Sequence, residues 1–142
     1  MTPAEIDLAR RIIACGLPVP QPRHRSFFDT DAIVVKLGNE VVATCHNPGS
    51  TDYDPATRIL WQVVTTDTGP ELLPVLDDYA LLGWLTHRFR AVYGSLASTT
   101  PNPYVPDAQL WSTYAANGDE ITSGPTEIEA LVAALEAAKA AK

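Results

Sequence analysis

Hydrophobic residues recur at helical spacing in three segments of the chain. The first segment begins at a capping box, in which the Thr2 hydroxyl and the Glu5 carboxylate each accept from the other residue's backbone N–H. Apolar residues then repeat every three or four positions up to Gly16, a residue suited to a left-handed helix stop. These patterns predict helices over residues 3–15, 75–93 and 126–141.

The longest predicted helix has a continuous apolar stripe. We expect its core-facing residues to be Leu81, Leu82, Leu85, Phe89 and Val92. Gly83 lies in the helix interior, where glycine costs about 1 kcal/mol relative to alanine. This cost leads us to expect a close backbone contact at the glycine.

Residues 32–46 predict a β-hairpin. Two β-branched runs flank Gly38-Asn39, a pair that tolerates the positive φ of a two-residue turn. In the resulting register Val35 faces Val42. Both faces of the hairpin are apolar, so we expect it to be covered on both sides or to form an interface.

Two further segments favour strands, and loops connect the predicted elements. Residues 58–66 combine a possible helix start with β-branched residues and are interpreted as a strand. Residues 110–122 alternate around Asn117-Gly118, which predicts a second hairpin. The proline-rich segments are predicted to be extended connections over residues 18–25 and 95–108.

The predicted fold class is α+β. Three helices would cover a largely antiparallel sheet in a single-domain sandwich over residues 1–142. The chain has 142 residues and 46% hydrophobic residues, which suits one domain that needs no disulfide or metal for stability. Neither a membrane-spanning run nor a secretion signal is visible, so we expect a soluble, cytoplasmic protein.

Charge narrows the classes of partner. A formal charge of −7 argues against a protein that coats extended nucleic acid, because such proteins cluster lysine and arginine. The acidic residues are dispersed, with Asp77-Asp78 among the few adjacent pairs, so the sequence shows no acidic ribbon that would mimic DNA.

Catalytic and metal-binding motifs are missing from the sequence. Cys15 and Cys45 each lie in an apolar stretch and are interpreted as buried thiols. The three histidines do not combine with them at zinc-site spacing, and no GxSxG, phosphate loop or HExxH occurs. We therefore expect no metal, no cofactor and no enzymatic activity, and an uncharacterised Cys/His or metal-dependent enzyme is kept as an alternative.

Candidate binding residues fall in three places. The only dense cationic cluster of the chain precedes a pair of phenylalanines, a mixture suited to phosphate groups or acidic partners. On the long helix, spacings of three and four residues place a tryptophan beside a histidine and an arginine, away from the apolar stripe. A tyrosine in the second proline-rich segment is the third candidate. The predicted binding residues are Arg23, His24, Arg25, Phe27, Phe28, Trp84, His87, Arg88 and Tyr104.

Several residue patterns of the C-terminal half occur together in one known family. They are Tyr-Ala-Leu-Leu at 79–82, Trp111, Asn-Gly-Asp at 117–119 and Thr-Glu-Ile-Glu-Ala-Leu at 126–131. In this order the chain resembles the small phage-encoded ABA-sandwich domain proteins, over about half of its length. The resemblance implies an origin in a phage or prophage rather than a particular activity.

The sequence therefore predicts a phage-like accessory protein without catalysis. It would engage a host or phage protein, or a small phosphorylated ligand, as an inhibitor or a sponge, in the host cytoplasm if it is phage-encoded. A structural subunit of a virion or another homo-oligomeric assembly is the alternative. In that case the hairpin 32–46 or the loop 95–108 would form the subunit contacts.

Overall fold

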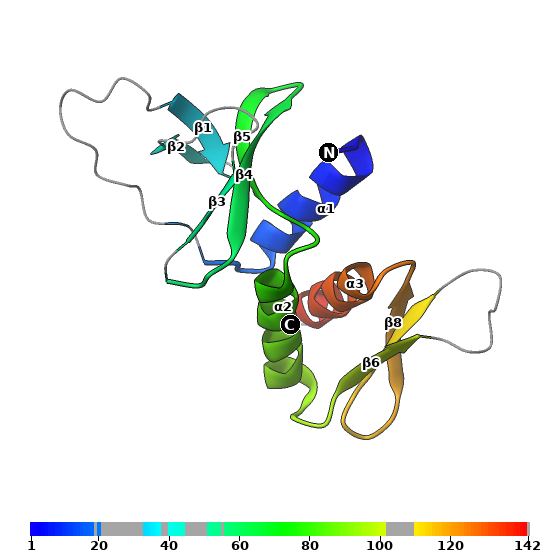
Figure 1. The fold of residues 1–142 in the computed structure, drawn as a ribbon. Coiled ribbons are helices and arrows are strands. Elements are labelled where there is room, and N and C mark those ends of the chain that lie inside the picture. Colours follow the sequence, from blue (N-terminus) through cyan, green and yellow to red (C-terminus); the bar gives the residue numbers. More distant parts are fainter. Residues whose placement is uncertain are drawn as a thin grey trace. The chain divides into compact units, whose positions relative to one another are not determined.

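The computed structural model describes residues 1–18, 20, 33–37, 40–44, 51–54, 56–101 and 110–141 (Figure 1). For residues 33–37, 40–44 and 52, the description concerns the backbone. The predicted α+β class is confirmed, since the described residues form three helices and two largely antiparallel sheets. The chain divides into two compact units, residues 1–81 and 82–142. The single domain expected from the length stays a prediction.

The first unit opens with α1 (Pro3–Ala14), close to the predicted bounds. Both hydrogen bonds of the predicted capping box are present: Glu5 N donates to Thr2 Oγ1 at 3.2 Å, and Thr2 N donates to the Glu5 carboxylate at 3.4 Å. Gly16 has a φ of +97°, which confirms the predicted left-handed stop. The buried face of the helix consists of Leu8, Ala9 and Ile12.

A five-stranded sheet forms most of the first unit. Its strands lie in the order β2-β1-β5-β4-β3. Their bounds are β1 (Ile33–Leu37), β2 (Glu40–Thr44), β3 (Thr51–Tyr53), β4 (Leu60–Thr66) and β5 (Gly69–Pro74). The predicted hairpin is confirmed with its register, because Val35 is paired with Val42. The predicted strand over 58–66 is confirmed as β4, while Gly38-Asn39 lies outside the described residues.

Strand β5 was not predicted, and its position explains why. It lies between β1, to which it is parallel, and β4, to which it is antiparallel. Residues 71–74 are all buried, so this central strand lacks the alternation of polar and apolar positions that marks a half-exposed strand. The short strand β3 was not predicted either.

The long helix begins later than predicted. Helix α2 spans Tyr79–Tyr93 rather than 75–93, because Val75 N still donates to Leu60 O of β4 at 2.9 Å. Asp78 precedes the first turn and accepts hydrogen bonds from Ala80 N at 3.1 Å and from Leu60 N at 2.7 Å. The aspartate therefore caps the helix and binds its start to β4.

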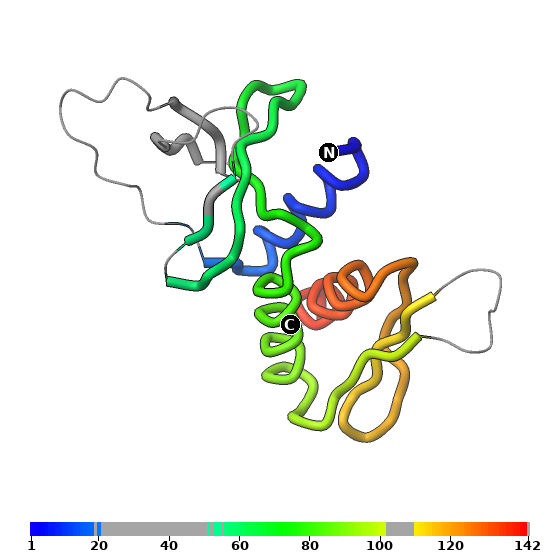
Figure 2. The backbone as a smooth tube through the Cα atoms, in the orientation of Figure 1, coloured from blue at the N-terminus to red at the C-terminus, as the bar shows by residue number. Residues whose placement is uncertain are grey.

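The second unit contains most of α2, a three-stranded antiparallel sheet and α3. The sheet order is β6 (Ser98–Pro101), β7 (Trp111–Tyr114) and β8 (Glu120–Gly124). Helix α3 (Glu127–Ala140) packs against all three strands, and Figure 2 follows the backbone through this unit. The core comprises Leu85, Phe89, Ala97, Thr113, Ala130, Leu131, Val132, Ala134 and Leu135.

The predicted hairpin at Asn117-Gly118 is confirmed, with a three-residue loop. Ala115 N donates to Asp119 O and Gly118 N donates to Ala115 O, both at 2.9 Å. Gly118 has a φ of +91°, the left-handed conformation that glycine adopts at the end of such loops. This turn sets the antiparallel pairing of β7 with β8.

Two expectations about connections and cysteines need correction. Within the predicted extended loop 95–108, residues 98–101 form the edge strand β6, where Pro101 is tolerated because an edge strand needs fewer N–H donors. Cys15 was expected to be buried but is half-buried, because it comes after the last turn of α1. Cys45 lies outside the described residues.

No helix within the described ranges is long and apolar enough to span a membrane.

Candidate functional site

Helix α2 holds the predicted binding residues that the structure describes. Trp84, His87 and Arg88 all lie on it, whereas the predicted residues Arg23, His24, Arg25, Phe27, Phe28 and Tyr104 lie outside the described residues. The helical segment thus supplies the candidate site, and the other six assignments stay predictions.

The three residues share the side of α2 that faces away from its core. Leu85 and Phe89 are completely buried, whereas His87 and Arg88 are exposed and Trp84 is half-buried. Spacings of three and four residues in a helix bring Trp84 next to both. The predicted separation of this group from the apolar stripe is therefore present in the structure.

Val92 extends the group and corrects a prediction. Expected in the core, it is 44% exposed, because Tyr93 takes the inner position at the end of the helix. The Tyr93 ring packs against Phe89 in a tilted arrangement at a centroid distance of 5.3 Å, and its hydroxyl donates to Ala134 O of α3 at 2.7 Å. Trp84, Arg88 and Val92 follow one another at intervals of four residues, but Val92 also lies seven residues after the buried Leu85, so spacing alone does not separate it from the core. Together with His87 they are called the α2 face.

The electrostatics of the α2 face differ from those of the whole chain. The helix contains two arginines and one histidine and no acidic residue, although the chain has a formal charge of −7. The Arg90 side chain is engaged within the protein, since its Nε donates to Ala97 O at 3.3 Å. Arg88 has no such intramolecular contact among the hydrogen bonds and ion pairs of the described residues, so its guanidinium is available to a partner.

Gly83 also lies on the exposed side of α2, and the expected close contact is wrong. A Cβ atom placed on this glycine would meet nothing within 4 Å. The glycine therefore has no packing role in the described structure, and it leaves the surface beside Trp84 uncovered.

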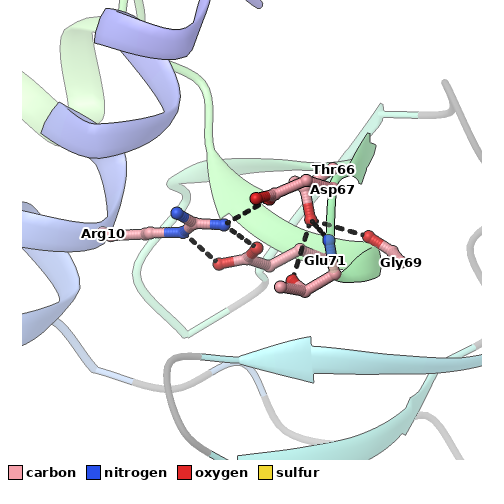
Figure 3. A network of polar contacts seen from close by, with 6 residues as sticks. Arg10, Thr66, Asp67, Gly69 and Glu71 are labelled. Atoms are coloured by element: carbon pink, nitrogen blue, oxygen red, sulfur yellow. Dashed lines mark hydrogen bonds and ion pairs between the residues drawn. The ribbon is translucent and has the colours of Figure 1, made fainter.

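A bidentate ion pair between Arg10 and Glu71 lies in the first unit, and its role is structural (Figure 3). Arg10 Nε and Nη2 donate to the two carboxylate oxygens of Glu71 at 2.9 and 2.8 Å, and Asp67 Oδ1 lies 3.9 Å from Nη2. Hydrogen bonding to Glu71 raises the pKa of Arg10 above its ordinary value. Both oxygens of the buried carboxylate are occupied, so this pair fastens α1 to β5 rather than offering a catalytic group.

One buried donor has no partner. The indole of Trp61, on β4, is 1% exposed, and its Nε1 is the only buried side-chain N or O atom among the described residues that lacks a hydrogen-bond partner. An unpaired buried N–H lowers the stability of the fold by about 1–3 kcal/mol. The apolar surface that the Trp61 side chain buries offsets this loss.

The described residues do not assemble a metal site. They include no group of three or more histidine, cysteine, aspartate or glutamate side chains that could hold an ion. His24, Cys45 and His46, which are among the residues that a Cys/His or metal-dependent enzyme could use, lie outside those residues.

Comparisons with known proteins found no match: no family model, no curated protein and no solved structure is similar to this chain. The resemblance to phage-encoded ABA-sandwich proteins stays a prediction.

Proposed function

We propose that the protein is a non-enzymatic binding protein whose α2 face engages an acidic surface on a partner protein. The observation that carries the proposal is the line Trp84–Arg88–Val92 on the exposed side of a helix without acidic residues. A tryptophan beside an arginine is a common pair of interface anchors. A binding role of the inhibitor or sponge type fits this arrangement.

The shape of the α2 face favours a protein over a small phosphorylated ligand. Small ligands bind in concave sites where several polar groups converge. Here one guanidinium, that of Arg88, projects from a helix surface, and the neighbouring Arg90 already donates to Ala97 O. A partner's groove with acidic edges would receive the helix, cover Trp84 and Val92, and pair with Arg88.

The test is capture of partners from a host lysate by the immobilised chain. The wild type is compared with Arg88→Glu and with Arg58→Glu, which changes the net charge equally at an exposed arginine of the first unit. We expect an acidic protein to be captured by the wild type and by Arg58→Glu, and lost with Arg88→Glu. Equal capture by all three would refute the assignment of the α2 face.

A second arm distinguishes the ligand classes. Inorganic phosphate is titrated into the wild-type chain while the amide resonances of α2 are followed by NMR. We expect no saturable shift, because a single exposed arginine makes a weak phosphate site. Saturable shifts confined to α2 would favour the phosphorylated-ligand alternative instead.

A further inference from the structure

Asn117 differs from the other asparagines of the chain in its C-terminal neighbour. The sequence has four asparagines: Asn117 precedes a glycine, Asn39 precedes a glutamate, and Asn47 and Asn102 each precede a proline. This difference matters for a reaction that needs no enzyme, in which the side-chain amide is attacked by the next backbone nitrogen.

The reaction is deamidation through a cyclic imide. The backbone nitrogen of the following residue loses its proton and forms a bond to the asparagine Cγ, while the Cγ–Nδ2 bond breaks and ammonia leaves with that proton. Water then opens the ring to aspartate or to isoaspartate. A glycine hinders the attack least because it has no side chain, and a proline has no N–H to supply the nucleophile.

In the folded turn both reacting groups of Asn117 are held by hydrogen bonds. The attacking atom, Gly118 N, donates to Ala115 O at 2.9 Å. The leaving group, Asn117 Nδ2, donates to Asp119 Oδ2 at 3.1 Å, and Asn117 Oδ1 accepts from Asp119 N at 3.0 Å. Cyclisation requires the Gly118 N–H to leave Ala115 O and Nδ2 to leave its contact with Asp119, although the turn itself is exposed to water.

We propose that Asn117 is a site of spontaneous deamidation that the folded β7–β8 turn suppresses. The modification then proceeds through local opening of the hairpin, and its rate reports the fraction of molecules in which the hairpin is open. This site is independent of the α2 face and of the function proposed for it.

The products of deamidation would weaken the β7–β8 turn, which in its folded form suppresses the reaction. An aspartate at position 117 cannot donate to the Asp119 carboxylate and places a second negative charge beside it. An isoaspartate lengthens the backbone by one methylene group, which displaces the Gly118 N–H from Ala115 O. Deamidation is therefore expected to favour further opening of β7–β8.

The test measures deamidation of the full chain in mildly alkaline buffer, folded and in urea. Trypsin releases residues 91–139 as one peptide, in which Asn102, followed by proline, is the internal control for Asn117. Tandem mass spectrometry locates the mass increase. We expect Asn117 to react about tenfold faster or more in urea than in the folded chain, and Asn102 to stay intact in both.

Two variants test the protecting contacts. Asp119→Ala removes the acceptor of Nδ2 and is expected to raise the folded-state rate toward that in urea, whereas Asp119→Asn keeps an acceptor and a low rate. Equal wild-type rates in folded and unfolded chains would overturn the proposal, whatever the variants do. So would a rate at Asn117 in urea no higher than that at Asn39.

Discussion

The ion pair between Arg10 and Glu71 joins residues 61 positions apart in the sequence. The Glu71 side chain is 3% exposed and that of Arg10 is 40% exposed, so the carboxylate depends on the guanidinium while the guanidinium still reaches water. A buried carboxylate left without its partner is strongly destabilising. The pair therefore contributes to the packing of α1 against β5, beside the burial of Leu8, Ala9 and Ile12.

Arg10→Ala should lower the free energy of unfolding by about 2 kcal/mol, because Glu71 then stays buried without a donor. Asp67→Ala is the matched control: it removes the 3.9 Å contact to an aspartate that is 88% exposed, and stability should not change measurably. Urea denaturation followed by circular dichroism measures both. Equal losses in the two variants would contradict the role given to Glu71.

Tyr93→Phe tests the contact between α2 and α3. Burial raises the pKa of the Tyr93 hydroxyl above its ordinary value of about 10, and this hydroxyl donates to Ala134 O. The wild type should be more stable than the variant by about 1 kcal/mol at neutral pH.

A raised pKa in the folded state means that this contribution is complete below about pH 10 and is lost as the pH rises through the folded-state value. The difference in unfolding free energy between wild type and Tyr93→Phe should therefore shrink in alkaline buffer. A difference that is constant from neutral to strongly alkaline pH would contradict the assignment.

At the scale of residues, the sequence predicts contacts between residues that lie a few positions apart in the chain. The Thr2–Glu5 capping box and the left-handed Gly16 depend on residues a few positions apart, and both are present. The Arg10–Glu71 pair depends on α1 packing against β5, a strand that was itself not predicted. Long-range pairing of this kind has no local pattern.

At the scale of elements, two glycines differ in whether a side chain would fit at their position. Gly83 lies in the interior of α2, and a Cβ atom there would meet nothing within 4 Å. Gly124 ends β8, and a Cβ atom there would lie 2.9 Å from Ala130 N of α3. The second glycine permits the close approach of α3 to the sheet, and the first does not serve packing.

Gly83→Ala should therefore raise the free energy of unfolding by about 1 kcal/mol, through the higher helix propensity of alanine. Gly124→Ala should lower it by about 1–3 kcal/mol, since the backbone of α3 has to move. Thermal denaturation of the two variants beside the wild type measures both signs. A loss of stability in Gly83→Ala would instead support the close backbone contact that the sequence led us to expect at this glycine.

Elements with a clear period were predictable, and those without one were not. The hairpin β1–β2 was predicted with its register because two β-branched runs flank a turn pair. Strand β5 is buried along residues 71–74 and so has no alternation, and β6 consists of serine, threonine and proline at a sheet edge. Helix α2 starts late because residues 74 and 75 are engaged with β4.

At the scale of the molecule, charge and exposure identify the candidate site. Spacing on the long helix was enough to group Trp84, His87 and Arg88, because helical periodicity is local. Val92 was assigned to the core because the sequence does not show that Tyr93 takes the inner position. The cluster Arg23–Phe28 and Tyr104 lie outside the described residues and stay predictions.

The oligomeric state separates the binding proposal from the assembly alternative. A protein that binds its partner through one helix face needs no second copy of itself, so we expect a monomeric mass by analytical ultracentrifugation at micromolar concentration. A stable closed oligomer or a filament would favour the virion or assembly alternative.

The most direct test of the α2 face is the dissociation constant for the captured partner. Arg88→Glu should weaken binding at least about tenfold, equivalent to about 1.4 kcal/mol, because it sets like charges against each other in the interface. Arg58→Glu makes the same change in net charge at an exposed residue that is not part of the α2 face, and it should leave the constant within about twofold of wild type. Equal dissociation constants for wild type and Arg88→Glu would contradict the account.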